Sequence, residues 1–373
     1  MNVHELPMIL FTVIGQMSVG AFWTLGAIHL YGYSKKMSPE TIDRITNTAL
    51  YAAGPLLVLG FFAAFFHLGD PFNALNTLRH LGSSWQSREI ASGILYGATG
   101  FAFAFSQWFG LFTRAIRQVL AGLTALAGFL LVLTMAGTYY SVETIPAWHH
   151  PATWIFFFTS ALLTGSLAVG VALLITWNLQ TRHDTTTTVS QSHTTSGSSS
   201  RSTGKAAISN NAARNSTTTM VKNKTQAAAP SSLVSRLKLV SNQPLTLELN
   251  RLTTTSLAGI SLAAALAGLV ILVTYPIYLL DLANGPAAAQ EVADRLLMPA
   301  SYIRWILLAL VIILAGVFAF IRARTATTPN TSLAWIITTT FLLAVTTELL
   351  GRGMHYEGLW HIGLNTTQTL LGH

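Results

Sequence analysis

Two ionisable side chains stand at the ends of neighbouring apolar segments of this sequence. His67 ends one segment and Glu89 begins the next. A membrane helix keeps such a group only where something offsets its desolvation, so both residues are candidates for function. An imidazole accepts and releases a proton near neutral pH, and a nearby carboxylate can orient it and stabilise its protonated form. The pair therefore predicts proton-coupled chemistry at one boundary of a membrane.

Each of these residues also has a purely structural interpretation. His67 is compatible with an interfacial histidine bonded to a nearby carbonyl group. Glu89 is predicted in the first turn of its helix, where the helix dipole favours a carboxylate, and Ser87 is the predicted N-cap. A capping role is therefore the main alternative for Glu89.

A second ionisable pair lies in the last apolar segment. Glu348 and Arg352 are four residues apart, a spacing that suits an ion pair along one helical face. The same side chains can instead bind the polar head group of a ligand. Both interpretations place the pair at the same membrane boundary as His67 and Glu89.

The composition indicates a membrane protein. Hydrophobic residues make up 51% of the 373 residues and charged residues only 9%, against about 25% in soluble proteins. The mean hydropathy is +0.50. Eight apolar stretches are long enough to cross about 30 Å of hydrocarbon, at residues 7–33, 46–68, 89–112, 117–140, 152–177, 253–280, 302–322 and 333–350. We predict an all-α integral membrane protein with eight transmembrane helices in two up-and-down four-helix bundles.

The net charge is +8. The basic residues are distributed as the predicted membrane topology requires, which argues against a nucleic-acid-binding surface. The basic residues of the short connections on one face are Lys35, Lys36, Arg44, Arg114, Arg117, Arg322 and Arg324. Those on the opposite face are Arg79, Arg88, Arg295, Arg304 and Arg352. The positive-inside rule places the first face in the cytoplasm and both termini outside.

The protein divides into three parts. Residues 1–177 hold transmembrane helices one to five, and residues 251–373 hold helices six to eight and a tail on the outer face. Residues 178–250 form a cytoplasmic insertion rich in Ser, Thr and Asn. Such a composition cannot bury enough apolar surface to offset the entropy of ordering, so we expect the insertion to be disordered.

Any redox chemistry is predicted near the outer face. The sequence contains no cysteine, which excludes cysteine-ligated iron–sulfur clusters in this protein. A haem between helices needs histidines at matched depths, whereas His29 and His67 are predicted at opposite boundaries. Most other polar residues fall at the outer boundary. We therefore expect no haem, metal or iron–sulfur cluster here, and direct transfer of electrons to an attached subunit.

Five short motifs occur in order along the sequence. They are His4–Gln16 (HELPMILFTVIGQ), His67–Pro71 (HLGDP) followed by Asn76, Glu89–Gly93 (EIASG), Val142–Trp148 (VETIPAW) and Glu348–Gly353 (ELLGRG). As a set they resemble the membrane anchor subunits of anaerobic dimethyl sulfoxide reductases. The resemblance covers nearly the whole sequence except residues 178–250.

The resemblance implies an eight-helix, haem-free subunit of the bacterial inner membrane with both termini periplasmic. It implies two partners, a molybdopterin catalytic subunit and an iron–sulfur subunit with four clusters. It also implies that the anchor binds menaquinol as its substrate and oxidises it at the periplasmic face, with His67 and Glu89 in the site. We expect Glu348 and Arg352 to line the same site. The sequence departs from the family in its long insertion and in Asn73, which stands where the family can carry basic residues.

Three other functions fit parts of the pattern. One is a related quinone-interacting anchor that serves a polysulfide, nitrite or tetrathionate enzyme. A second is a passive assembly anchor that has no quinol site. The third is a secondary transporter, which would need buried charges and interrupted helices near the midplane. The predicted helix centres are nearly free of charge, which argues against transport.

Overall fold

The computed structural model describes residues 6–65, 71–196 and 246–358, and every regular element in these ranges is a helix. The predicted all-α class is therefore confirmed for the described residues. His67 lies outside them, so its predicted role stays a prediction. Most of the predicted insertion and the C-terminal tail also lie outside.

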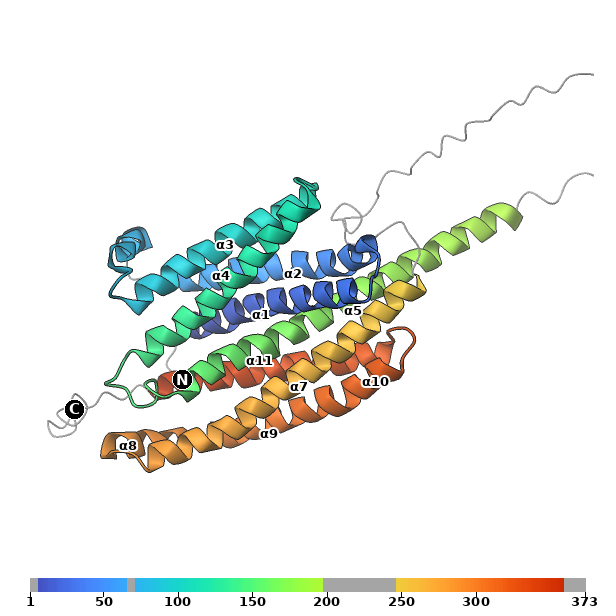
Figure 1. The fold of residues 1–373 in the computed structure, drawn as a ribbon. Coiled ribbons are helices and arrows are strands. Elements are labelled where there is room, and N and C mark those ends of the chain that lie inside the picture. The colour runs from blue at the N-terminus through green and yellow to red at the C-terminus, as the bar shows by residue number, and fades with distance from the viewer. Residues whose placement is uncertain (1–5, 66–70, 197–245, 359–373) are drawn as a thin grey trace, which may run out of the picture. The chain divides into compact units, whose positions relative to one another are not determined.

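The elements follow one another along the sequence as shown in Figure 1. They are α1 (Leu6–Ser34), α2 (Pro39–Phe65), the 3₁₀ helix η2 (Pro71–His80), α3 (Trp85–Phe109), α4 (Arg114–Tyr140), α5 (Ala152–Ser196), α7 (Leu247–Ala283), α8 (Ala287–Leu296), α9 (Pro299–Ile313), the π-helical η3 (Leu314–Ala319), α10 (Phe320–Thr325) and α11 (Thr331–Glu357). α9, η3 and α10 succeed one another without a break.

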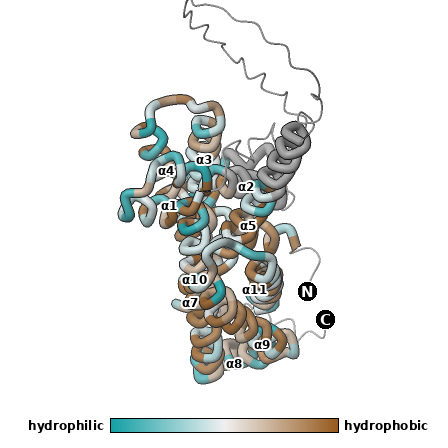
Figure 2. Tube along the Cα trace, turned by 90° about the vertical axis from the view of Figure 1, so that its right-hand side faces the viewer, coloured by the Kyte–Doolittle hydropathy of each residue, from teal (hydrophilic) through white to brown (hydrophobic). Residues whose placement is uncertain are grey.

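Six helical stretches among the described residues are long and apolar enough to cross a membrane. They are Leu6–Ser34, Arg114–Tyr140, Ala152–Thr181, Leu247–Ala283, Pro299–Thr325 and Thr331–Glu357. Figure 2 shows hydrophobic residues along α7 and α9, with hydrophilic residues nearer the helix ends. The molecule is thus a multi-pass membrane protein. Crossings by α2 and α3, and the arrangement in two four-helix bundles, stay predictions.

Helices that are neighbours in sequence lie side by side. α1 lies against α2, α3 against α4, and α7 against α9 and α10 (Figure 1). α1 also contacts α4 and α11, so it connects the beginning of the sequence to its last helix. This connection matters because it brings the predicted polar residues of α3 and α11 to the same end of the bundle.

α1 and α5 cross with their backbones in contact. A Cβ atom on Gly20 would lie 1.8 Å from the carbonyl oxygen of Ala161, and one on Gly165 would lie 2.3 Å from the amide nitrogen of Ala21. Glycine is required at both positions because the obstructing atoms belong to the backbone. Small residues allow membrane helices to approach in this way.

The start of the predicted insertion differs from expectation. The described residues up to Ile175 and from Thr246 onward form one compact unit, and Thr176–Ser196 belong to a second. However, α5 continues to Ser196, so residues 178–196 are helical and not disordered. The physical reason is that extending a helix already formed by an apolar segment costs little compared with nucleating one.

Candidate functional site

Glu89 lies one turn further inside its helix than the sequence indicated. α3 begins at Trp85, and the N-cap is Ser84, whose side chain accepts a hydrogen bond from the backbone N–H of Ser87. The prediction of Ser87 as N-cap was therefore wrong, and the first turn of α3 contains no acidic residue. This removes the capping interpretation of Glu89.

The carboxyl group of Glu89 is held between α3 and α4. Its side chain is buried, and Oε2 accepts a hydrogen bond of 2.7 Å from the hydroxyl group of Thr138. One turn along, the hydroxyl groups of Ser92 and Thr134 are 2.7 Å apart and join the same two helices. Two polar contacts thus fix the position of an ionisable group at the end of an apolar helix pair.

Tyr139, the next residue of α4, contacts α11. The hydroxyl group of Tyr139 hydrogen-bonds that of Tyr356, and both side chains are buried. Tyr139 also lies within electrostatic range of Glu89 and Arg352. The structure therefore brings two predicted site residues, Glu89 and Arg352, to the same end of the bundle, with a pair of tyrosines beside them.

Arg352 is enclosed by α1 and α5. Its Nη2 donates a hydrogen bond of 2.8 Å to Oε1 of Gln16, and its guanidinium carbon lies 3.7 Å from the centre of the Phe157 ring. The side chain is only 4% exposed. A buried arginine normally needs several hydrogen-bond partners, yet the Nε atom of Arg352 and the Nε2 atom of Gln16 have none among the described residues.

The predicted ion pair between Glu348 and Arg352 is not formed. Oε1 of Glu348 instead lies 3.6 Å from Nη2 of Arg304, which α9 contributes. The Arg304 guanidinium also fits against Gly351, since a Cβ atom there would lie 2.6 Å from its Cζ. The pairing was wrong because the partners of both residues come from helices distant in sequence, which a spacing rule cannot include.

His355 is a site residue that the sequence interpretation missed. Its ring stacks on that of Trp148, with centres 5.5 Å apart and planes at 16°, and its carbonyl group accepts a hydrogen bond of 2.8 Å from the Trp148 indole. The predicted helix ended at residue 350, which placed His355 in a tail. Its spacing of three residues from Arg352 on the same helical face was the available signal.

A small cavity lies among these polar groups. It has a volume of about 30 Å³, and its walls include Arg304, Glu348, Arg352 and His355. That volume suits about one water molecule. Oε1 of Glu348, Nε of Arg352 and Nε2 of His355 lack hydrogen-bond partners among the described residues. The lining is therefore suited to bridging water.

The connection between α4 and α5 covers this end of the bundle. Nε2 of His150 lies 2.7 Å from the carboxylate of Asp281, and the Tyr278 hydroxyl donates to the carbonyl of Ala147. Ile145 and Ala147 are buried against α7 and α11. Residues 6–65, 71–196 and 246–358 gather no group of three His, Cys, Asp or Glu side chains fit for a metal ion.

Comparison with known proteins relates this sequence to a family. Residues 1–229 match the family described as DMSO reductase anchor subunit (DmsC). An anaerobic dimethyl sulfoxide reductase chain of Haemophilus influenzae is 34% identical over 179 residues, which cover 47% of this sequence and 60% of that protein. An anaerobic dimethyl sulfoxide reductase chain of Escherichia coli is 32% identical over 171 residues, which cover 46% of this sequence and 58% of that protein.

A further relative serves a different enzyme. A sulfite dehydrogenase subunit of Allochromatium vinosum is 30% identical over 145 residues, which cover 36% of this sequence and 44% of that protein. The matches thus span less than two thirds of the length of each of these relatives. The family match extends over more than half of this sequence and includes the helices that hold Gln16, Glu89 and Tyr139. The chain belongs to the DMSO reductase anchor subunit (DmsC) family.

Proposed function

We propose that this protein is the haem-free membrane anchor of a dimethyl sulfoxide reductase-type molybdoenzyme and oxidises menaquinol near the periplasmic face. The observation that carries the proposal is the buried carboxyl group of Glu89, which Thr138 holds between α3 and α4. Glu89 neither caps its helix nor has an ion-pair partner among the described residues. A buried ionisable group without such a structural role is expected to bind a ligand or to take up and release a proton.

The proposed reaction releases two electrons and two protons from each quinol. His67 takes the two quinol protons one after the other, and Glu89 stabilises each resulting imidazolium and receives its proton before the next transfer. Both electrons pass to the iron–sulfur subunit, and the oxidised quinone returns to the membrane. Because protons and electrons leave on the same side, the reaction moves no net charge across the membrane.

The polar groups near Glu89 supply a route for these protons. Tyr139 lies within electrostatic range of Glu89, and its hydroxyl group bonds that of Tyr356. Arg352 and His355 line the small cavity on α11. In the proposal these groups and a bridging water carry protons outward, and Glu348 and Arg352 act in this route.

The proposed partner subunits are inferred from the family, and the proposed membrane orientation from the charge distribution. An anchor of this family is expected to bind an iron–sulfur subunit and a molybdopterin catalytic subunit, with no nucleic acid partner. The excess of lysine and arginine beside residues 35 and 322 supports an orientation in a bacterial inner membrane with both termini periplasmic. Eight crossings are part of the proposal.

A second function is favoured by the similarity to a sulfite dehydrogenase subunit. The anchor of a dehydrogenase receives electrons from its partner and reduces a quinone, so the same residues would run the chemistry in reverse. Anchors of polysulfide, nitrite or tetrathionate enzymes fall in the same class, because the catalytic subunit selects the substrate.

The test is quinol-dependent turnover in membranes that hold the assembled complex. Glu89→Gln keeps the size and the Thr138 contact but cannot take up a proton, so we expect turnover to fall about 100-fold, as for loss of a general base. His67→Arg is expected to act similarly. Glu143→Gln, an exposed glutamate at the same end, is the matched control and should leave turnover unchanged.

Three results would contradict this proposal. Undiminished turnover in both His67→Arg and Glu89→Gln removes the mechanism. A complex that never oxidises quinol, while its partners remain attached, identifies a passive anchor. Quinone reduction driven by the partner, without quinol oxidation, identifies the dehydrogenase alternative.

A further inference from the structure

A large cavity opens at the opposite end of the bundle from Glu89. It has a volume of about 640 Å³ and lies between α1, α2, α3 and α4, close to the end of α1 and the beginning of α2. Ligand sites in proteins commonly have volumes of about 300–1,000 Å³. This cavity includes His29, the residue that stood out near the inner boundary in the sequence.

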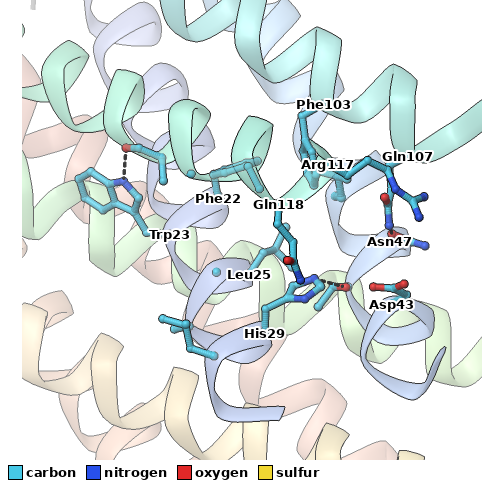
Figure 3. Close-up of a pocket in the computed structure, with 18 of the residues that line it drawn as sticks. Phe22, Trp23, Leu25, His29, Asp43, Asn47, Phe103, Gln107, Arg117 and Gln118 are labelled. Atoms are coloured by element: carbon cyan, nitrogen blue, oxygen red, sulfur yellow. Dashed lines mark hydrogen bonds between the residues drawn. The ribbon is translucent and has the colours of Figure 1, made fainter. Parts of the chain in front are cut away.

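The cavity is apolar at one end and polar at the other. Figure 3 shows Trp23, Phe22 and Leu25 on one side, and His29, Asp43, Asn47 and Gln118 on the other. The polar residues come from the last turns of α1 and the first turns of α2 and α4. This arrangement matches an amphiphile whose head lies at the helix ends and whose hydrocarbon tail points into the membrane.

Most neutral polar groups of the cavity already bind one another. Nε2 of His29 lies 2.8 Å from the hydroxyl group of Thr46, and Nε2 of Gln107 donates to Oδ1 of Asn47 at 2.8 Å. Gln118 donates to the Tyr33 hydroxyl at 2.7 Å. A quinone head would have to break these bonds, which disfavours a second quinone site.

Among the described charged residues that line the cavity, only Arg117 has no ion-pair partner. Arg114 and Asp43 form an ion pair at 2.7 Å, so they neutralise each other. Arg117 also lines the cavity, and its Nε is buried without a hydrogen-bond partner among the described residues. An arginine guanidinium is well suited to binding a phosphate group. The cavity therefore has one site for an anion beside an apolar chamber.

The cavity also has room for an acyl tail and lies beside a lipid-facing surface. Cβ atoms added to Gly26 or Gly122, which both line it, would meet nothing within 4 Å. Leu30, another lining residue, is 72% exposed. The same end of the molecule holds Lys35 and Lys36, which the positive-inside rule assigns to the cytoplasmic leaflet, where anionic lipids gather.

We propose that this cavity binds one anionic phospholipid, with the phosphate against Arg117 and one acyl tail between Phe22, Leu25 and Phe103. The contact is independent of the quinol site, which lies at the other end of α3 and α4. The bound lipid fills the space between the α1–α2 and α3–α4 pairs.

The proposal is tested on the purified complex in a mild neutral detergent. Dioleoyl phosphatidylglycerol is titrated in, and native mass spectrometry counts the bound lipid. We expect one tightly held molecule. Arg117→Gln should weaken its binding about tenfold, the effect of losing one charged hydrogen bond. Gly122→Leu should block the apolar chamber and abolish binding while leaving Arg117 in place.

Matched controls and competing ligands decide the outcome. Arg324→Gln and Gly259→Leu change an arginine and an unobstructed glycine outside the cavity, and both should bind the lipid as the parent does. Dioleoyl phosphatidylcholine, inorganic phosphate and menaquinone are each expected to bind at least tenfold more weakly. Equal binding of phosphatidylcholine or inorganic phosphate, preferential binding of menaquinone, or full lipid binding in Gly122→Leu would overturn the proposal.

Discussion

The two ends of α4 differ in how the space beside the helix is used. At one end, a Cβ atom on Gly137 would lie 2.4 Å from the ring of Trp85, so α3 and α4 are in close contact beside Glu89. At the other end, Gly122 faces open space in the large cavity. A tightly packed end holds a few polar groups in fixed positions, as proton transfer requires. An open end tolerates a flexible acyl tail, as lipid binding requires.

Arg352→Met is expected to have the largest effect on the stability of the tightly packed end. The substitution keeps an apolar side chain of similar length but removes the donor to Gln16 and leaves Glu348 with Arg304 as its cation. Losing a buried hydrogen bond to a charged group, and leaving Oε1 of Gln16 without its donor, costs about 1.5–3 kcal/mol. Thermal unfolding in detergent should show this loss, whereas the exposed Arg324→Met should unfold like the parent. An unchanged transition in Arg352→Met would mean that this end is not held by its charges.

A smaller effect is expected from exchanging the glycines of α4. Gly137→Leu forces Trp85 to move and should cost about 1–3 kcal/mol, the usual range for overpacking. Gly122→Leu enters open space, so in the complex stripped of lipid it should lack this overpacking cost. Both variants gain a similar helix propensity of about 0.8 kcal/mol over glycine, which cancels in the comparison. Denaturation of both variants side by side measures the difference in packing directly. Equal stabilities would show that the two ends are packed alike.

The smallest effect is expected from Tyr356→Phe. The variant keeps the ring but leaves the buried Tyr139 hydroxyl group without this partner, a loss of about 1 kcal/mol. Tyr302→Phe, at an exposed position of α9, is the control and should be neutral. If Tyr356→Phe is as stable as its control, the tyrosine pair contributes to chemistry alone.

Much of the helical framework was predictable, because each membrane helix corresponds to a continuous run of apolar residues in the sequence. Each predicted apolar segment lies largely within a helix of the structure. Glu89 was also recognisable, because an ionisable residue at the edge of an apolar run is conspicuous without any knowledge of the fold. Its contact with Thr138 was not, since that residue looks like an ordinary helical threonine.

The errors arose where polar residues continue a helix or where partners come from distant helices. α3 begins at Trp85 and α11 extends to Glu357, in both cases through polar sequence beyond the apolar run. Gln16 and Arg304 gave only the weak signal of isolated polar residues within or beside apolar segments. Their contacts with Arg352 and Glu348 depend on tertiary packing, which no local spacing encodes.

The crossing of α1 and α5 has a consequence for motion at the proposed quinol site. Gln16 and Phe157, which enclose Arg352, each lie one helical turn from the touching backbones at Gly20 and Ala161. Neither helix can slide or rotate there without a clash of main-chain atoms. The α1 and α5 side of the site is therefore rigid. We therefore expect the movement that admits a quinol to occur on the α3 side of the site.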